Sequence, residues 1–117
     1  MNTIKDLSSK IKEVNENCST DFQKFRAFNR MKGIMYKLTW LVENVTVEGK
    51  VTGFIADTNE EPFEVEIAFD LSDKEMCKAI AQVEKGETVE IQVKTISIVF
   101  TEEKDIVLFE IKNVRRL

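Results

Sequence analysis

The spacing of apolar residues changes near residue 33, and this change constrains the fold more than any other feature of the sequence. Before Gly33, apolar residues recur every three or four positions, as on one face of an α-helix. After it they alternate with polar residues, as in half-buried strands, except in the helical stretch "LSDKEMCKAIAQVEKG" at residues 71–86. The predicted order is therefore two helices, three strands, one helix and two strands.

The first 33 residues are expected to form a helical hairpin. Asn2 or Thr3 is the expected N-cap of the first helix, and "NENCST" interrupts the helical period before Ser19 or Thr20 caps the second. Gly33 is the expected stop of that second helix. The first helix has one narrow apolar stripe, made of Ile4, Leu7, Ile11 and Val14.

The second helix has a wider apolar surface, because Phe22, Phe25, Phe28 and Met31 follow one another at intervals of three. Burying a large apolar side chain stabilises a protein by about 1.5 to 3 kcal/mol. We therefore expect the three phenylalanine rings to belong to the core, and only the opposite side, with Arg26 and Arg30, to be free to bind a partner.

The strands are expected to be strongly bent. Alternation on even positions breaks at Asn44, which predicts either a tight hairpin or a bulge, and a second switch near Thr95 predicts a bulge or bend. Gly49 and Gly53 fit such bending, since glycine within a strand marks bulges and close backbone approach. Residues 57–62, "DTNEEP", are expected to form a loop, and residues 106–114 a central last strand.

The helix at residues 71–86 has the clearest end signals. Ser72 is its expected N-cap, with Glu75 as the capping-box partner and Leu71 with Met76 as a hydrophobic staple. Gly86 is its expected C-terminal stop.

Three stretches, "VEGKVTGFIAD", "VEKGETVEIQVKTISI" and "IVLFEIKNV", resemble the first strand, the helix-to-fourth-strand segment and the fifth strand of OB-fold domains of the tRNA-anticodon-binding-like type. The resemblance covers residues 36–114 and implies a five-stranded barrel with one helix between its third and fourth strands. The predicted fold class is α+β, with a helical hairpin (1–33) packed on an OB-like barrel (34–117) in a single domain, 1–117. Another small α+β sheet fold is the alternative.

Catalytic and metal-binding chemistry has little support. The chain has no histidine, the commonest general base and metal ligand. Cys18 and Cys77 form no CxxC pair, and the glycines form no phosphate-binding loop. We expect a protein that is not an enzyme and that needs no metal or cofactor.

The chain has no long apolar segment. No apolar run approaches the roughly 18 residues of a membrane span, and the polar opening "MNTIKDLSSK" lacks the core of a signal peptide. The sequence therefore predicts a cytoplasmic protein with no membrane partner.

Charge is distributed unevenly along the chain. Residues 1–40 carry eight Lys or Arg against four Asp or Glu, and residues 41–117 carry nine against seventeen. OB barrels normally bind nucleic acid with cations and aromatic platforms. The first functional hypothesis is thus binding of single-stranded DNA or RNA, alone or in a nucleoprotein complex, with Phe54 or Trp40 for stacking. The expected phosphate contacts are Lys24, Arg26, Arg30 and Lys32.

The outward positions of the predicted strands are mainly acidic and should repel phosphates. The second hypothesis is therefore a protein-binding adaptor or inhibitor that presents an acidic face to a basic partner, such as a nucleic-acid-handling enzyme. That face would consist of Glu48, Glu64, Glu66, Glu90 and Glu110. The cations of the hairpin are open to three readings: contact with phosphates, contact with an acidic protein, or contact with the acidic barrel of this chain or of a second copy in a homodimer.

Overall fold

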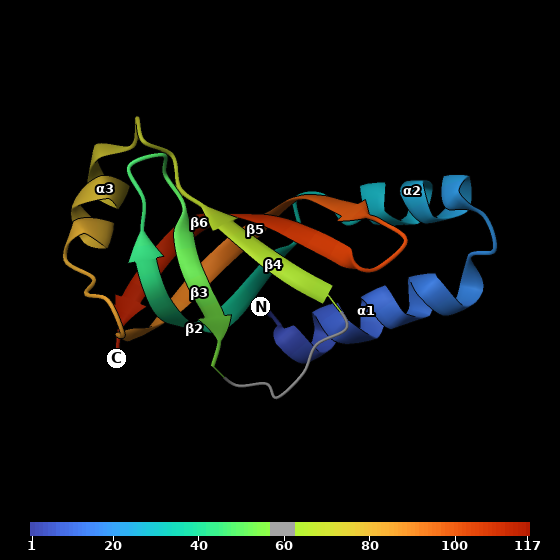
Figure 1. Ribbon diagram of the computed structural model, residues 1–117, viewed down its shortest axis with the longest axis horizontal. Helices are drawn as coiled ribbons and strands as arrows, with labels where there is room; N and C mark the ends of the chain where they lie inside the picture. The colour runs from blue at the N-terminus through green and yellow to red at the C-terminus, as the bar shows by residue number, and fades with distance from the viewer. Residues whose placement is uncertain (57–62) are drawn as a thin grey trace.

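A computed structural model describes residues 1–56 and 63–117, which form three helices and a six-stranded mixed sheet (Figure 1). The expected loop at residues 57–62 lies outside the described residues. The elements in chain order are β1 (Asn2–Thr3), α1 (Ile4–Asn17), α2 (Asp21–Asn29), β2 (Met35–Val45), β3 (Val51–Ile55), β4 (Phe63–Ala68), α3 (Lys74–Ala81), β5 (Thr88–Phe100) and β6 (Asp105–Arg116). The predicted order of helices and long strands is confirmed, and only the two-residue β1 was not expected. Within the described residues, none of the helices has both the length and the apolar character needed to span a membrane.

The strands lie in the order β1-β2-β5-β6-β4, with β3 paired to the other edge of β2. β1 with β2 and β4 with β6 are parallel pairs, and the remaining pairs are antiparallel. Among the described residues, β3 and β4 meet at one end only, through a bridge between Lys50 and Ala68 and a hydrogen bond from the Phe69 amide to the Gly49 carbonyl (2.8 Å). From there the two strands diverge (Figure 1). The predicted α+β class is therefore confirmed, whereas the predicted five-stranded barrel is not: the mixed sheet has six strands and stays open, because these two short strands do not pair along their length.

The expected bends of the strands are present. The register of β2 on β3 shifts between Val42 and Asn44, and that of β5 on β6 shifts between Thr95 and Ser97. Gly53 lies where β3 crosses β2 so closely that a Cβ atom would stand 2.0 Å from the Leu41 carbonyl oxygen. Both predicted parity breaks thus mark real irregularities, and only glycine fits the close approach.

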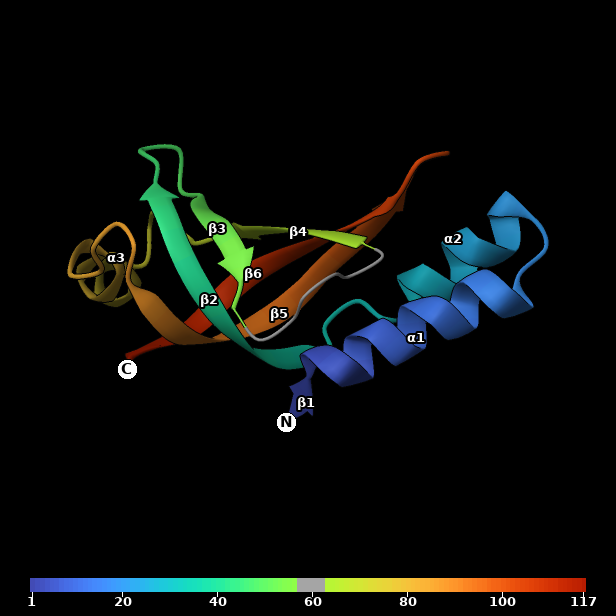
Figure 2. The same ribbon diagram turned by 60° about the horizontal axis from the view of Figure 1, so that its bottom comes forward.

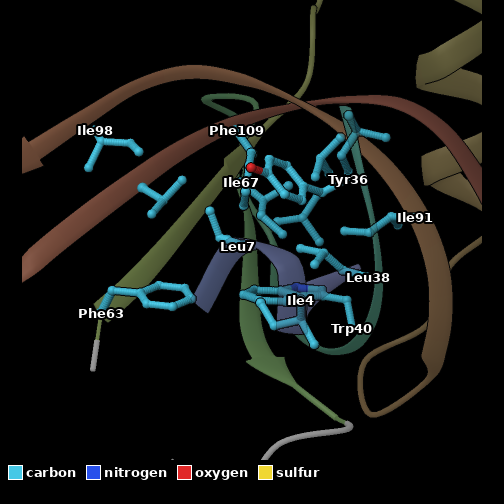
Figure 3. Packing of buried hydrophobic residues seen from close by; sticks show 14 of the residues in the cluster. Ile4, Leu7, Tyr36, Leu38, Trp40, Phe63, Ile67, Ile91, Ile98 and Phe109 are labelled. Atoms are coloured by element: carbon cyan, nitrogen blue, oxygen red, sulfur yellow. The ribbon is translucent and has the colours of Figure 1, made fainter. Parts of the chain in front are cut away.

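The core lies between the concave side of the sheet and α1 (Figures 2 and 3). Leu7 and Ile11 of α1 are fully buried, and Ile4 is nearly so, which confirms the predicted stripe of the first helix. They pack against side chains of the sheet that include Tyr36, Leu38, Trp40, Ile91, Val107 and Phe109.

Two of the three helices end earlier than expected. Thr3 and Thr20 are the N-caps of α1 and α2, as predicted, but α2 ends before Gly33, which lies in the following turn with a φ of +85°. α3 is capped by Asp73, not by Ser72, because the Asp73 carboxylate accepts a hydrogen bond from the Met76 amide (3.1 Å). α3 also ends before residue 86, so Gly86 belongs to the turn leading to β5.

Candidate binding groove between α2 and β5

The three phenylalanine rings of α2 differ in their environment. Phe28 is 1% exposed, whereas Phe22 is 68% and Phe25 58% exposed. The expectation that all three belong to the core is therefore wrong for two of them. α2 packs near the C-terminal end of β5, beyond the pair of Lys94 with Met35, the first residue of β2, so only the Phe28 side of the helix has sheet beneath it.

A groove of about 320 Å³ separates the outer side of α2 from the end of β5. Its lining consists of Phe25, Asn29 and Lys32 on the helical side, and Ser97, Ile98, Val99 and Phe100 on the strand. The Phe28 and Phe100 rings, with centroids 5.9 Å apart, hold the helix and the strand together at this place. Most of the groove surface is therefore aromatic or aliphatic, and none of its lining residues is acidic.

Cations lie on α2 and in the turn after it, and one of them, Lys32, lines the groove. The Lys24 ammonium lies 5.2 Å from the centre of the Phe100 ring, a favourable cation–π arrangement. Arg26, Arg30 and Lys32 are exposed, and none of these four cations forms an ion pair with a carboxylate in the described parts of the chain. The described residues therefore do not support the reading in which these cations lie against the acidic sheet of their own chain.

Five cations in or next to the sheet are, in contrast, paired with nearby carboxylates. The pairs are Lys37 and Arg115 with Glu90, Lys104 with Glu64, Lys112 with Glu110, and Arg116 with Glu87. No carboxylate of the described residues forms such an ion pair with the four cations of α2 and the turn after it.

The residues predicted to bind nucleic acid do not all come together. Lys24, Arg26, Arg30 and Lys32 gather on α2 and the turn after it, but Phe54 lies on β3 and is 62% exposed. Trp40, the other ring expected to stack on bases, is 2% exposed and belongs to the core, so that expectation is wrong.

The residues predicted to form an acidic protein-binding face are spread over three strands and a turn. Glu64 and Glu66 lie on β4, Glu90 on β5 and Glu110 on β6, and Glu48 follows β2 in a turn. Glu64, Glu90 and Glu110 are engaged in the ion pairs described above. Three of the five glutamates are therefore already paired with cations of the same chain.

Shifted pKa values occur away from the groove and have structural causes. A hydrogen bond from the Arg116 side chain lowers the pKa of Glu87, and one from the Ser72 hydroxyl lowers that of Asp70. Burial raises the pKa of Tyr36, which packs in the core. These shifts reflect turn and core contacts and add nothing to the chemistry of the groove.

The exposed apolar residues in and beside the groove were not expected from the sequence. Phe25 and Val99 (46% exposed) line the groove, and Phe22 and Ile96 (43% exposed) are exposed on the same two elements. The parity switch near Thr95 marked the bend of β5, but no local signal showed that the pairing with β2 stops beside it, at Met35 and Lys94.

Comparison with known proteins supplies no relative: no protein-family model matches the chain, and no curated protein matches it in sequence. A function for the groove has to be argued from its geometry.

Proposed function

We propose that this protein is a binding module that holds a segment of another protein in the groove between α2 and β5. The observation that carries the proposal is the exposure of two phenylalanine rings on a helix beside an apolar groove. Clustered exposed apolar side chains mark interaction sites more often than chance exposure does. Here Phe25 of α2 and Val99 of β5 both line the groove, and Phe22 and Ile96 are further exposed apolar residues of the same two elements.

The side chains of the groove favour a partner with both apolar and acidic residues. Ile98 and Val99 are aliphatic and suit apolar side chains of a protein, whereas bases stack on aromatic rings. The cations beside the groove would attract carboxylates and speed association. The proposed partner is therefore an acidic segment with apolar anchors.

We also propose that the sheet is an OB-like fold that is open along one seam. The support is the order of three strands, a helix and two strands, together with the pairing of β2 with β3 and β5, and of β6 with β5 and β4. A partly open five-stranded Greek-key barrel has this composition.

Single-stranded nucleic acid is the second candidate ligand, because four cations that form no ion pair with the described residues lie on α2 and the turn after it, together with two exposed rings. Cations together with stacking platforms are the usual elements of such binding. The face around Phe54 supports it less, since Glu64 and Glu66 lie on the adjacent β4. Binding of this kind should weaken steeply as salt rises.

A peptide selection tests the first candidate. The full-length protein is immobilised and a phage-displayed library of random 12-residue peptides is selected on it. We expect enrichment of acidic sequences with apolar residues, and binding of the synthetic peptides measured by fluorescence anisotropy. Phe25→Ala should weaken that binding by roughly 30-fold or more, as for an anchor residue.

Phe54→Ala is the matched control, because it removes an equally exposed ring outside the groove. We expect it to leave peptide binding unchanged. Absence of enrichment, or equal effects of the two substitutions, would contradict the proposal. A labelled 12-nucleotide oligothymidine, titrated at low and at high salt, provides the second arm: salt-sensitive binding lost on Arg26→Glu would favour nucleic acid instead.

A further inference from the structure

One edge of β5 changes its neighbour halfway along the strand. The pairing of β5 with β2 ends at Lys94. Thr95 then makes the last backbone contacts on that side, donating to the Ile34 carbonyl (3.0 Å) and accepting from the Gly33 amide (2.8 Å). In the described chain, β6 is the only strand paired with residues 96–100. Residues 96–100 of β5 therefore form an edge of the sheet, whereas the N-terminal part of β5 lies between β2 and β6.

The groove runs along this edge. Four consecutive residues, 97–100, line it. Successive side chains of a strand point to opposite faces of the sheet, so a groove on one face would touch only every second residue. A groove touched by all four lies beside the backbone, where the unpaired amide and carbonyl groups of an edge strand are located.

We propose that the partner segment binds as an additional β-strand along residues 97–100 of β5, an inference that rests on the proposed function of the groove. Backbone hydrogen bonds to the edge would supply affinity, and the side chains of the added strand would supply specificity. Its apolar residues contact Phe25 and Val99, and its carboxylates lie near Lys24 and Lys32. The partner is thus an extended, acidic peptide segment and not a preformed helix.

A second copy of this chain fits the same edge less well. Two β5 edges paired about a two-fold axis would each bring the cations of their own α2 to one shared interface. Like charges brought together at an interface oppose association, whereas carboxylates of an acidic peptide favour it. The positive charge beside the groove therefore favours an acidic peptide over a second copy of this chain.

Backbone N-methylation of the peptide obtained by selection tests strand addition directly. The peptide is made unmodified, methylated on alternate amides in one register, and methylated on the remaining amides. Only one set of amides of an added strand faces β5, because backbone groups alternate between the two edges. We expect one methylated form to bind about 10-fold or more weakly, and the other to bind like the unmodified peptide.

Hydrogen exchange of the full-length protein provides the second measurement. Bound peptide should slow exchange of amides within residues 96–100, while exchange in α3, at the other end of the molecule, stays unchanged (Figure 1). Equal binding of both methylated forms overturns strand addition but leaves the groove as the binding site. Loss of binding by both forms indicates a helical peptide and also overturns it. A selection with no enrichment, or a bound peptide indifferent to Phe25→Ala, overturns the proposed function as well.

Discussion

α1 and α2 form one hairpin and both contain apolar residues at helical spacing, yet α1 buries far more of its stripe, of which only Val14 is partly exposed. Leu7 and Ile11 of α1 have no exposed surface, whereas Phe22 and Phe25 of α2 are more than half exposed. α1 crosses the concave side of the sheet, and its Asn15 amide donates a hydrogen bond to the Asp105 carboxylate at the start of β6 (2.8 Å). α2 lies beside the end of β5, where one neighbouring strand is missing.

The difference shows that an apolar helical face is buried only as far as there is sheet beneath it. The periodicity of the two helices is a local property of the chain, but the extent of the sheet beside α2 depends on where β2 begins to pair with β5. The surplus apolar surface of α2 is therefore available for a partner, and the surface of α1 is not.

The largest effect is expected for Phe28, the one buried ring of α2. Phe28→Ala should lower the free energy of unfolding by about 3 to 5 kcal/mol, because it empties a packed site against Phe100. Phe25→Ala, three residues earlier on the same helix, should change it by less than about 0.5 kcal/mol. Urea denaturation of both variants measures the difference, and similar losses would refute the contrast between buried and exposed rings.

A loss of about 2 to 5 kcal/mol is expected for Leu7→Ala in α1, since Leu7 is fully buried in the core. Lys5→Ala, an exposed neighbour on the same helix, serves as the control and should be nearly neutral. Denaturation followed by circular dichroism reports both values. A loss below about 1 kcal/mol for Leu7→Ala would mean that α1 contributes little to the core.

Capping of α2 should matter less than its buried ring. The Thr20 hydroxyl oxygen accepts a hydrogen bond from the Gln23 amide (3.2 Å), so Thr20→Ala should cost about 1 kcal/mol. Thr20→Ser keeps the hydroxyl and should retain most of that stability. If the alanine and serine variants unfold at the same urea concentration, the cap does not stabilise α2.

The smallest effect concerns the pH dependence of α1. The Thr3 amide donates to the Asp6 carboxylate (2.7 Å), which lowers the pKa of Asp6 below its ordinary value of 3.8. A lowered pKa in the folded state means that the carboxylate stabilises the protein above about pH 4, and that this contribution is lost as the pH falls through the folded-state pKa. Stability measured between pH 6 and 2 should therefore decline less in Asp6→Asn than in the original protein.

Asp70 and Glu87 also have lowered pKa values, so the Asp6→Asn variant should keep part of the decline. Equal slopes in the variant and the original protein would show that the Thr3–Asp6 contact is not maintained in solution.

Part of the candidate site was predictable from the sequence. The cations Lys24, Arg26, Arg30 and Lys32 were expected on one basic helix, and they lie close together on α2 and the turn after it. The apolar half of the groove was not predicted, because Phe25 and Val99 have the same local pattern as buried residues. Phe54 was proposed to stack on nucleic acid and the five glutamates to bind a basic protein, and both roles remain predictions.

Local sequence signals were enough to predict the order of the helices and long strands, the buried residues of α1 and the bends near Asn44 and Thr95, since periodicity, caps and parity breaks act between residues close in the chain. The exposure of Phe22 and Phe25, the divergence of β3 from β4 and the edge at the end of β5 could be found in the three-dimensional fold alone. Each of these depends on which strand lies beside another and on where that neighbour stops. Such contacts join residues far apart in the sequence, so a local sequence pattern cannot predict them.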